Sequence, residues 1–226
     1  MVKSIELQER DMAILEHVSR FRMSTVPILR VRFYEDKEED AVHSTVRRLV
    51  GGGYLASAKL KPPRRVYYHL TGKAVRMMGL PSSLGNSLGE QALPTRYSVL
   101  CFCCRGTYRE PLLPLEFEEE FPECIDKRIP KEPYYYDNEG KAPRLSYLMI
   151  DLGADSGRII RKCRRVFGER LKVQGFRSLI EGDAFSVTIL TQQESKKRSI
   201  ELARKRASDF THPVRVEVVS EVMGMV

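Results

Sequence analysis

The strongest constraint on the fold of this chain is a run of three glycines, Gly51 to Gly53, between two different hydrophobic patterns. From about Glu38 to Val50, apolar residues recur at intervals of one, three and four, which is the spacing of one helix face. From Tyr54 to Leu60 the residues alternate, as in a half-buried strand. Glycine resists helix continuation and readily adopts the left-handed cap conformation. The sequence therefore predicts a helix that stops at the glycines and a strand that follows them.

Further elements are expected on both sides of this helix. Ser24 or Thr25 can cap a preceding helix, which tolerates Pro27 in its first turn. The segment 61–65 is basic and contains two prolines, so it is expected to be the turn of a hairpin. Within residues 1–80 the expected elements are helices at about 7–18, 24–34, 38–50 and 71–78, and strands at 54–60 and 66–70.

Positive charge is concentrated in the same third of the chain. The whole chain has 38 basic and 30 acidic residues, a net charge of +8, and residues 1–80 hold 15 of the basic and 9 of the acidic ones. No acidic residue occurs between Asp40 and Glu90, where eight basic residues lie. Such a stretch indicates a surface that faces a polyanion such as DNA or RNA. A solvated basic surface without a partner would give the same composition.

Two segments resemble the winged helix-turn-helix family of DNA-binding domains. The end of its recognition helix is similar to Val46-Arg47-Arg48-Leu49-Val50-Gly51-Gly52-Gly53-Tyr54-Leu55. The step that closes its wing is similar to Tyr67-Tyr68-His69-Leu70-Thr71-Gly72-Lys73. The order of the expected elements over residues 8–79, about a third of the chain, also agrees with that family.

The resemblance implies that the partner is double-stranded DNA. A recognition helix lies in the major groove, where Arg can bond to guanine and Ser or Thr can reach base edges or phosphates. The tip of a wing lies along the backbone or enters the minor groove. The alternative for each residue is an ordinary exposed side chain. The expected DNA contacts are His43, Ser44, Thr45, Arg47 and Arg48 on the helix, and Lys59, Lys61, Arg64 and Arg65 on the hairpin.

The remaining two thirds of the chain are expected to form a second domain. Residues 81–93 are rich in Gly, Ser and Pro and indicate a linker after a first domain at 1–80. Residues 94–226 show strand and helix patterns in alternation, which predict an α/β domain with a mixed sheet. The chain as a whole is therefore expected to be α+β.

The cysteines and the apolar segments limit the cellular context. The cysteine count is five, an odd number, and Cys101, Cys103 and Cys104 lie close together. Zinc sites usually need a second ligand pair, so buried free thiols are expected, with no metal and no cofactor. A disulfide framework is not expected, and the cytoplasm is the expected location. The longest apolar stretch, around Ser98–Cys104, is far shorter than the roughly 20 residues of a membrane span, so no membrane contact is expected.

The strand end Asp151-Leu152-Gly153 and the helix after it resemble the restriction-endonuclease-like core. A winged helix before such a core looks like the replication-relaxation family of plasmid and mobile-element proteins. An active nuclease of that fold needs acidic metal ligands and a lysine. Here Gly153 stands at the lysine position and the upstream Pro-Asp step is missing, which leaves Asp151 and Lys162 as the nuclease candidates. The motif is incomplete, so Asp151 is interpreted as a strand-end residue that bonds to the next loop.

These observations favour a sequence-specific double-stranded DNA-binding protein over an enzyme. Its role would be that of a transcriptional regulator or of a control factor for replication or mobile elements. It would act as a homodimer, with the second domain used for dimerisation, partner contact or ligand contact. Two alternatives remain open: a metal-dependent DNA nuclease with a winged-helix targeting domain, and a winged helix that serves as a protein-interaction subunit.

Overall fold

A computed structural model describes residues 5–34, 39–60, 65–106, 108–140, 142–223 and 225. The chain is a mixed α+β protein, as the sequence predicts. It divides into two compact units, of which the first runs to Cys104 and the second begins at Arg105.

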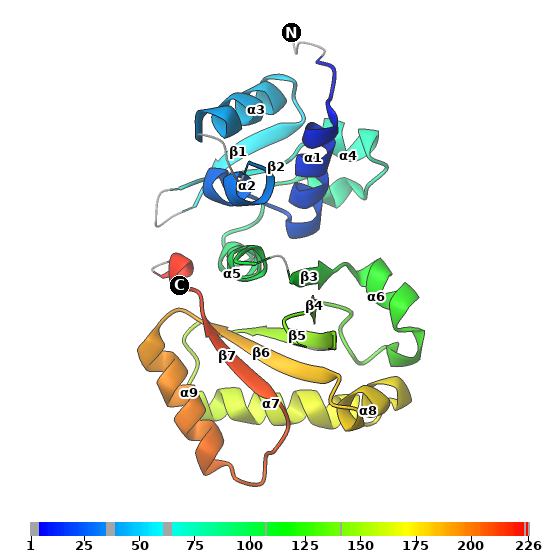
Figure 1. The fold of residues 1–226 in the computed structure, drawn as a ribbon, viewed down its shortest axis with the longest axis vertical. Helices are drawn as coiled ribbons and strands as arrows, with labels where there is room; N and C mark the ends of the chain where they lie inside the picture. Colours follow the sequence, from blue (N-terminus) through cyan, green and yellow to red (C-terminus); the bar gives the residue numbers. More distant parts are fainter. Residues whose placement is uncertain are drawn as a thin grey trace. The chain divides into compact units, whose positions relative to one another are not determined.

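The first unit contains helices and one antiparallel hairpin, in the order expected from the sequence (Figure 1). The glycine run ends the third helix as predicted: Gly53 has φ 73°, and the amide of Tyr54 donates to the carbonyl of Leu49 at 2.9 Å. The elements are α1 (Glu9–Phe21), α2 (Val26–Phe33), α3 (Glu39–Gly51), β1 (Leu55–Lys59), β2 (Val66–Leu70), α4 (Gly72–Met77), the 3-10 turn η1 (Ser82–Gly85) and α5 (Leu93–Cys104).

Ser24 connects the hairpin to the helices. Its amide donates to the carbonyl of Tyr68 at 2.9 Å, and the amide of Tyr68 donates back to Ser24 at 2.8 Å. Ser24 lies between α1 and α2, so this bridge adds a short third strand segment to the β1–β2 hairpin. Apolar residues of α1 to α4 and of both strands pack into one core, which fixes α3 and the hairpin to the same body.

The first unit extends beyond the expected boundary at residue 80. Residues 81–93 were expected to be a linker, but they contain η1, and Arg22 donates to the carbonyl of Ser83 at 3.0 Å. The helix α5, expected in the second domain, contacts α1 and α2. The physical reason lies in its composition, because a helix that is apolar all round needs neighbours on all its sides.

The second unit is built on a mixed five-stranded sheet in the order β3-β4-β5-β6-β7. The first two pairs are antiparallel and the last two are parallel. This confirms the mixed sheet expected for the C-terminal part. The elements are β3 (Arg109–Leu112), α6 (Pro114–Glu120), the 3-10 turn η2 (Pro122–Cys124), β4 (Tyr134–Asp137), β5 (Arg144–Ile150), α7 (Ser156–Arg170), α8 (Gln174–Glu181), β6 (Phe185–Thr191), α9 (Glu194–Arg206), β7 (Val214–Val218) and the 3-10 turn η3 (Ser220–Val222).

Helices α7 and α9 make the two crossovers between the parallel strands. They pack against each other, and Figure 1 shows both on one face of the sheet. Asp155 caps α7, since its Oδ1 accepts from the amide of Arg158 at 3.0 Å. Apolar residues of β5, β6, α7 and α8 form the core under these helices. The charged side of α7 is thereby left facing outward.

A buried histidine stabilises the region around Ser24 in its neutral form. The Nε2 atom of His17 lies 3.0 Å from the Oγ atom of Ser24, and the ring contacts Phe21 and Phe33. Burial, with smaller contributions from the charges of Arg32 and Arg20, lowers the pKa of His17 to about 4.

This pKa predicts an acid-sensitive contribution to stability. Below pH 6.5 the unfolded chain protonates His17, whereas the folded chain does not until about pH 4, so the unfolded state binds more protons in this window. Stability should therefore fall as the pH falls from 6.5 to 4. In His17→Gln that part of the dependence disappears, so the free energies of unfolding of parent and variant should converge by up to about 3 kcal/mol. Urea unfolding of both proteins from pH 6.5 to pH 4 measures this convergence. If the two free energies of unfolding changed in parallel with pH, the lowered pKa of His17 would be contradicted.

Candidate nucleic-acid interface

The outer face of α3 carries two exposed polar side chains from the expected set. Val42 and Val46 point into the core, and this orientation leaves Ser44 and Arg47 exposed to solvent. Ser44 and Arg47 are three residues apart and therefore lie on one side of the helix. In the described part of the chain neither side chain has a hydrogen-bonded partner. Both are free to contact a ligand.

Two other residues that were expected to contact DNA, His43 and Thr45, contact neighbouring side chains of the first unit instead. His43 lies 3.5 Å from Glu39, one turn earlier on α3. Thr45 donates to the carbonyl of Ala41 at 3.1 Å and accepts from the hydroxyl of buried Tyr34 at 2.7 Å. Thr45 thus joins α3 to the end of α2, and His43 lies beside an acidic side chain.

Arg48 forms an ion pair rather than a free outward charge. Its Nη2 atom donates to both carboxylate oxygens of Asp11, at 2.5 and 2.6 Å. Asp11 is 1% exposed and also accepts from the amide of Gln8 at 2.8 Å. The pair joins α3 to the first turn of α1. The structure therefore gives Arg48 a structural contact in place of the outward position expected from the sequence.

Of the cations expected on the hairpin, one is exposed and one is hydrogen-bonded within the first unit. Lys59 is exposed at the end of β1. Lys61 and Arg64 lie outside the described residues. Arg65 donates to the hydroxyl of Tyr97 on α5 at 3.1 Å. Burial raises the pKa of Tyr97 to about 12, so this hydroxyl stays protonated and Arg65 is held against α5. The structure therefore gives Arg65 a partner within the first unit.

Two cations outside the expected set, Arg30 and Arg32, are exposed on α2. Arg30 and Arg32 flank Val31, which is itself 59% exposed. Their position in the last turn of α2 is favourable for the helix dipole. In the sequence these residues are two arginines on either side of an apolar residue, whereas the apolar pattern of this helix indicates only the residues that face the core.

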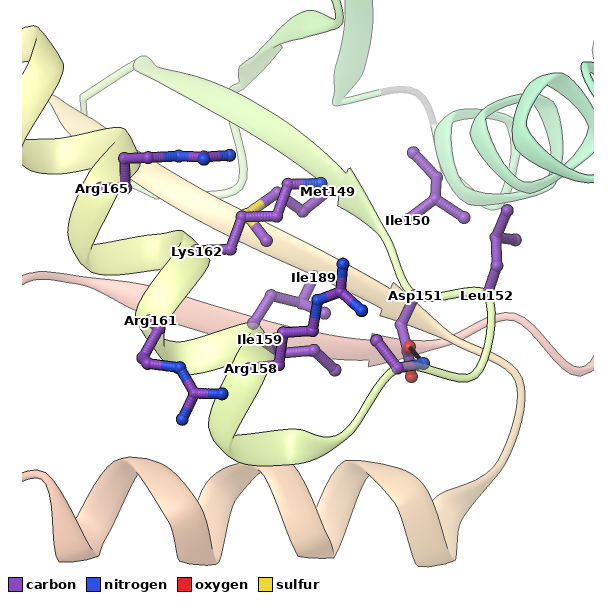
Figure 2. A pocket seen from close by; sticks show the side chains of 11 residues that line it. Met149, Ile150, Asp151, Leu152, Arg158, Ile159, Arg161, Lys162, Arg165 and Ile189 are labelled. Carbon is purple, nitrogen blue, oxygen red and sulfur yellow. Dashed lines mark hydrogen bonds between the residues drawn. The ribbon is translucent and has the colours of Figure 1, made fainter.

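In the second unit, Asp151 and Lys162 line one cavity of about 650 Å³ (Figure 2). Asp151 is 6% exposed, and its Oδ1 accepts from the amides of Gly153 at 3.0 Å and Ala154 at 2.9 Å. Its Oδ2 accepts from the hydroxyl of Thr191 at 3.3 Å. These bonds confirm the interpretation of Asp151 as a strand-end residue that bonds to the following loop.

The acidic set required by a metal-dependent nuclease is not assembled around this cavity. Among the described residues no group of three or more His, Cys, Asp and Glu side chains is close enough to hold a metal ion. Asp137 and Glu139, the nearest acidic residues upstream in the sequence, are bound by Arg215 at 3.2 and 2.6 Å. Among the described residues that line the cavity, Asp151 is the acidic side chain.

The five cysteines are free and buried, as expected from the sequence. Burial raises the pKa of Cys104 to about 12 and that of Cys163 to about 12. Neutral, buried thiols are unreactive, and Cys163 packs against the sulfur of Met149 at 3.8 Å. Each cysteine is a buried packing residue of its own unit.

Comparisons with protein-family models, curated proteins and solved structures give no match. Among the described residues, no helix combines the length and the apolar character that crossing a bilayer requires.

Neighbouring arginines on α3 are expected to differ sharply in their effect on stability. Arg48→Ala leaves the buried Asp11 carboxylate unpaired and should lower the free energy of unfolding by about 2 kcal/mol. Arg47→Ala removes an exposed side chain and should change it by less than about 0.5 kcal/mol. Chemical denaturation of the two variants measures the difference, and equal effects would contradict the structural role of Arg48.

Proposed function

We propose that this chain is a sequence-specific double-stranded DNA-binding protein whose first unit is a winged helix-turn-helix. The observation that carries the proposal is the Ser24 to Tyr68 bridge, because it attaches the hairpin to the three helices as a wing would be attached. In this interpretation α3 is the recognition helix, and its glycine stop leads directly into the wing.

The exposed face of α3 would enter the major groove. Arg47 is suited to bidentate bonds with guanine, and Ser44 to a base edge or a phosphate. Thr45 and Arg48 support this face from behind, through Tyr34 and Asp11. Their role is to hold α3 in place rather than to contact DNA.

Phosphate contacts would come from exposed cations around this face. In helix-turn-helix proteins the helix before the recognition helix crosses the DNA backbone. Arg30 and Arg32 at the end of α2 meet that requirement, and Lys59 on β1 adds a further charge. Lys61 and Arg64, which the sequence pattern predicts to lie in the turn of the hairpin, are further proposed contacts.

The proposed cellular role is control of transcription, of replication or of a mobile element, exercised by a homodimer. Proteins of this type bind two half-sites about one helical turn apart. We expect a footprint that covers two such half-sites, together with a dimeric mass in sedimentation. A single protected half-site bound by a monomer would contradict the dimer and leave the DNA-binding proposal standing.

Two single substitutions separate base reading from backbone contact. Selection of bound duplexes from a random pool first defines the preferred site. Arg47→Gln should then weaken binding to that site by about 1–3 kcal/mol while relaxing the preference at one position. Arg30→Gln should weaken binding to all DNA sequences alike and should reduce the slope of log K against log salt concentration by about one.

Arg76→Gln is the matched control, because Arg76 is an exposed cation on α4, outside the proposed interface. It should leave affinity and preference unchanged. If no sequence is enriched from the pool, or if all three variants behave alike, the first unit is not a DNA reader and a protein-interaction role becomes the better account.

A further inference from the structure

Three cations on one face of α7 extend over the cavity in the second unit. The cavity lies between α7 and the strands β5 and β6. Figure 2 shows Arg158, Lys162 and Arg165 extending from α7 at the cavity, and Arg161, the residue before Lys162, also lines it. Spacings of four and three residues place Arg158, Lys162 and Arg165 on one helix face.

This positive charge is not neutralised within the described part of the chain. Asp151 is the acidic residue in the cavity lining, and both its carboxylate oxygens are already hydrogen-bonded. Arg165 has a loose, exposed contact with Glu169 at 3.8 Å. Arg158 and Lys162 have no acidic partner among the described residues. Like charges one turn apart repel each other, so an anion bound here would relieve that repulsion.

The floor of the cavity is aliphatic. Met149, Ile159 and Ile189 are buried beneath the cations. The arrangement therefore suits a ligand with several negative charges and a less polar part between them. The helix rises 1.5 Å per residue, so the three cations are spread over about 10 Å along α7 and can contact more than one phosphate of a strand.

We propose that this cavity binds the phosphate backbone of a nucleic-acid strand, with phosphates on Arg158, Lys162 and Arg165 and sugar carbons against the aliphatic floor. It is a second nucleic-acid contact, located in the second unit, and it requires neither base reading by α3 nor catalysis. A free nucleotide carries the same chemistry in a smaller molecule, so the test compares strands with mononucleotides.

The first experiment measures the salt dependence of binding by the full chain. A duplex and a single strand of equal length and arbitrary sequence serve as probes. Arg158→Gln/Lys162→Gln/Arg165→Gln should lower the slope of log K against log salt by about 2 to 3, since each phosphate contact contributes about 0.7 to 0.9. Lys127→Gln/Lys172→Gln/Lys205→Gln removes the same charge from exposed positions outside the cavity and should leave the slope unchanged.

Two further measurements show whether a lower slope in the α7 triple variant results from lost contacts or from misfolding. Arg158→Lys/Arg165→Lys keeps the charges and should keep the slope of the parent. In the unmodified protein, a saturating nucleic-acid strand should protect Lys162 from acetylation by several-fold and leave Lys127 reactive. Equal slopes in the two triple variants, unchanged acetylation of Lys162, or equal protection of Lys162 by a mononucleotide would each overturn the proposal.

The outcome is separable from that of the proposed function. If Arg47→Gln has no effect on sequence preference while the α7 variant lowers the salt slope, the α7 site stands and base reading by α3 fails. The reverse pattern rejects the α7 site and leaves the proposed function intact.

Discussion

The bridge between Ser24 and Tyr68 is the interaction on which the organisation of the first unit depends. A hairpin alone is only marginally stable in water, and two backbone hydrogen bonds, together with the shared apolar core, attach this one to the helices. His17 supports the bridge by bonding to the side chain of Ser24 in its neutral form. Because of this bridge, the direction of the hairpin is fixed by the same core that orients α3. Any joint action of the two elements on a ligand depends on it.

The order of the elements was predictable from the sequence, because it depends on local signals. The glycines Gly51 to Gly53 end a helix for conformational reasons that hold in any protein. The alternation of 54–60 and 66–70 likewise needs no knowledge of distant residues. The α+β class and the mixed sheet of the second unit follow from such patterns, and the structure bears them out.

The partners of individual side chains were not predictable in this way. Arg47 and Arg48 are adjacent and look equivalent in the sequence, yet Arg48 pairs with Asp11, which is 37 residues away. Arg65 similarly binds Tyr97, in a helix that the sequence assigned to the other domain. Such contacts depend on the tertiary packing of α1, α3 and α5. Periodicity shows which side of a helix faces inward, but it does not show which exposed charge meets a distant partner.

The two units present their free charges differently. In the first unit, several cations of the expected site are engaged by neighbours, which concentrates the proposed reading surface on Ser44 and Arg47. In the second unit, α7 keeps a row of cations over an open cavity with an aliphatic floor. Asp151, at the edge of this cavity, is bonded to the loop that follows β5.

Cleavage of DNA from a reagent tethered to α3 tests the central claim most directly. The native cysteines are buried, so Ser44→Cys provides one reactive thiol on the face of α3 to carry an iron chelate that cuts nearby DNA. Ser208→Cys, at an exposed position after α9, serves as the control attachment. On a duplex selected by the protein, the account predicts localised cuts in the major groove from position 44 and none at that place from position 208. Absent or diffuse cutting from position 44, under conditions where the duplex is bound, would contradict it.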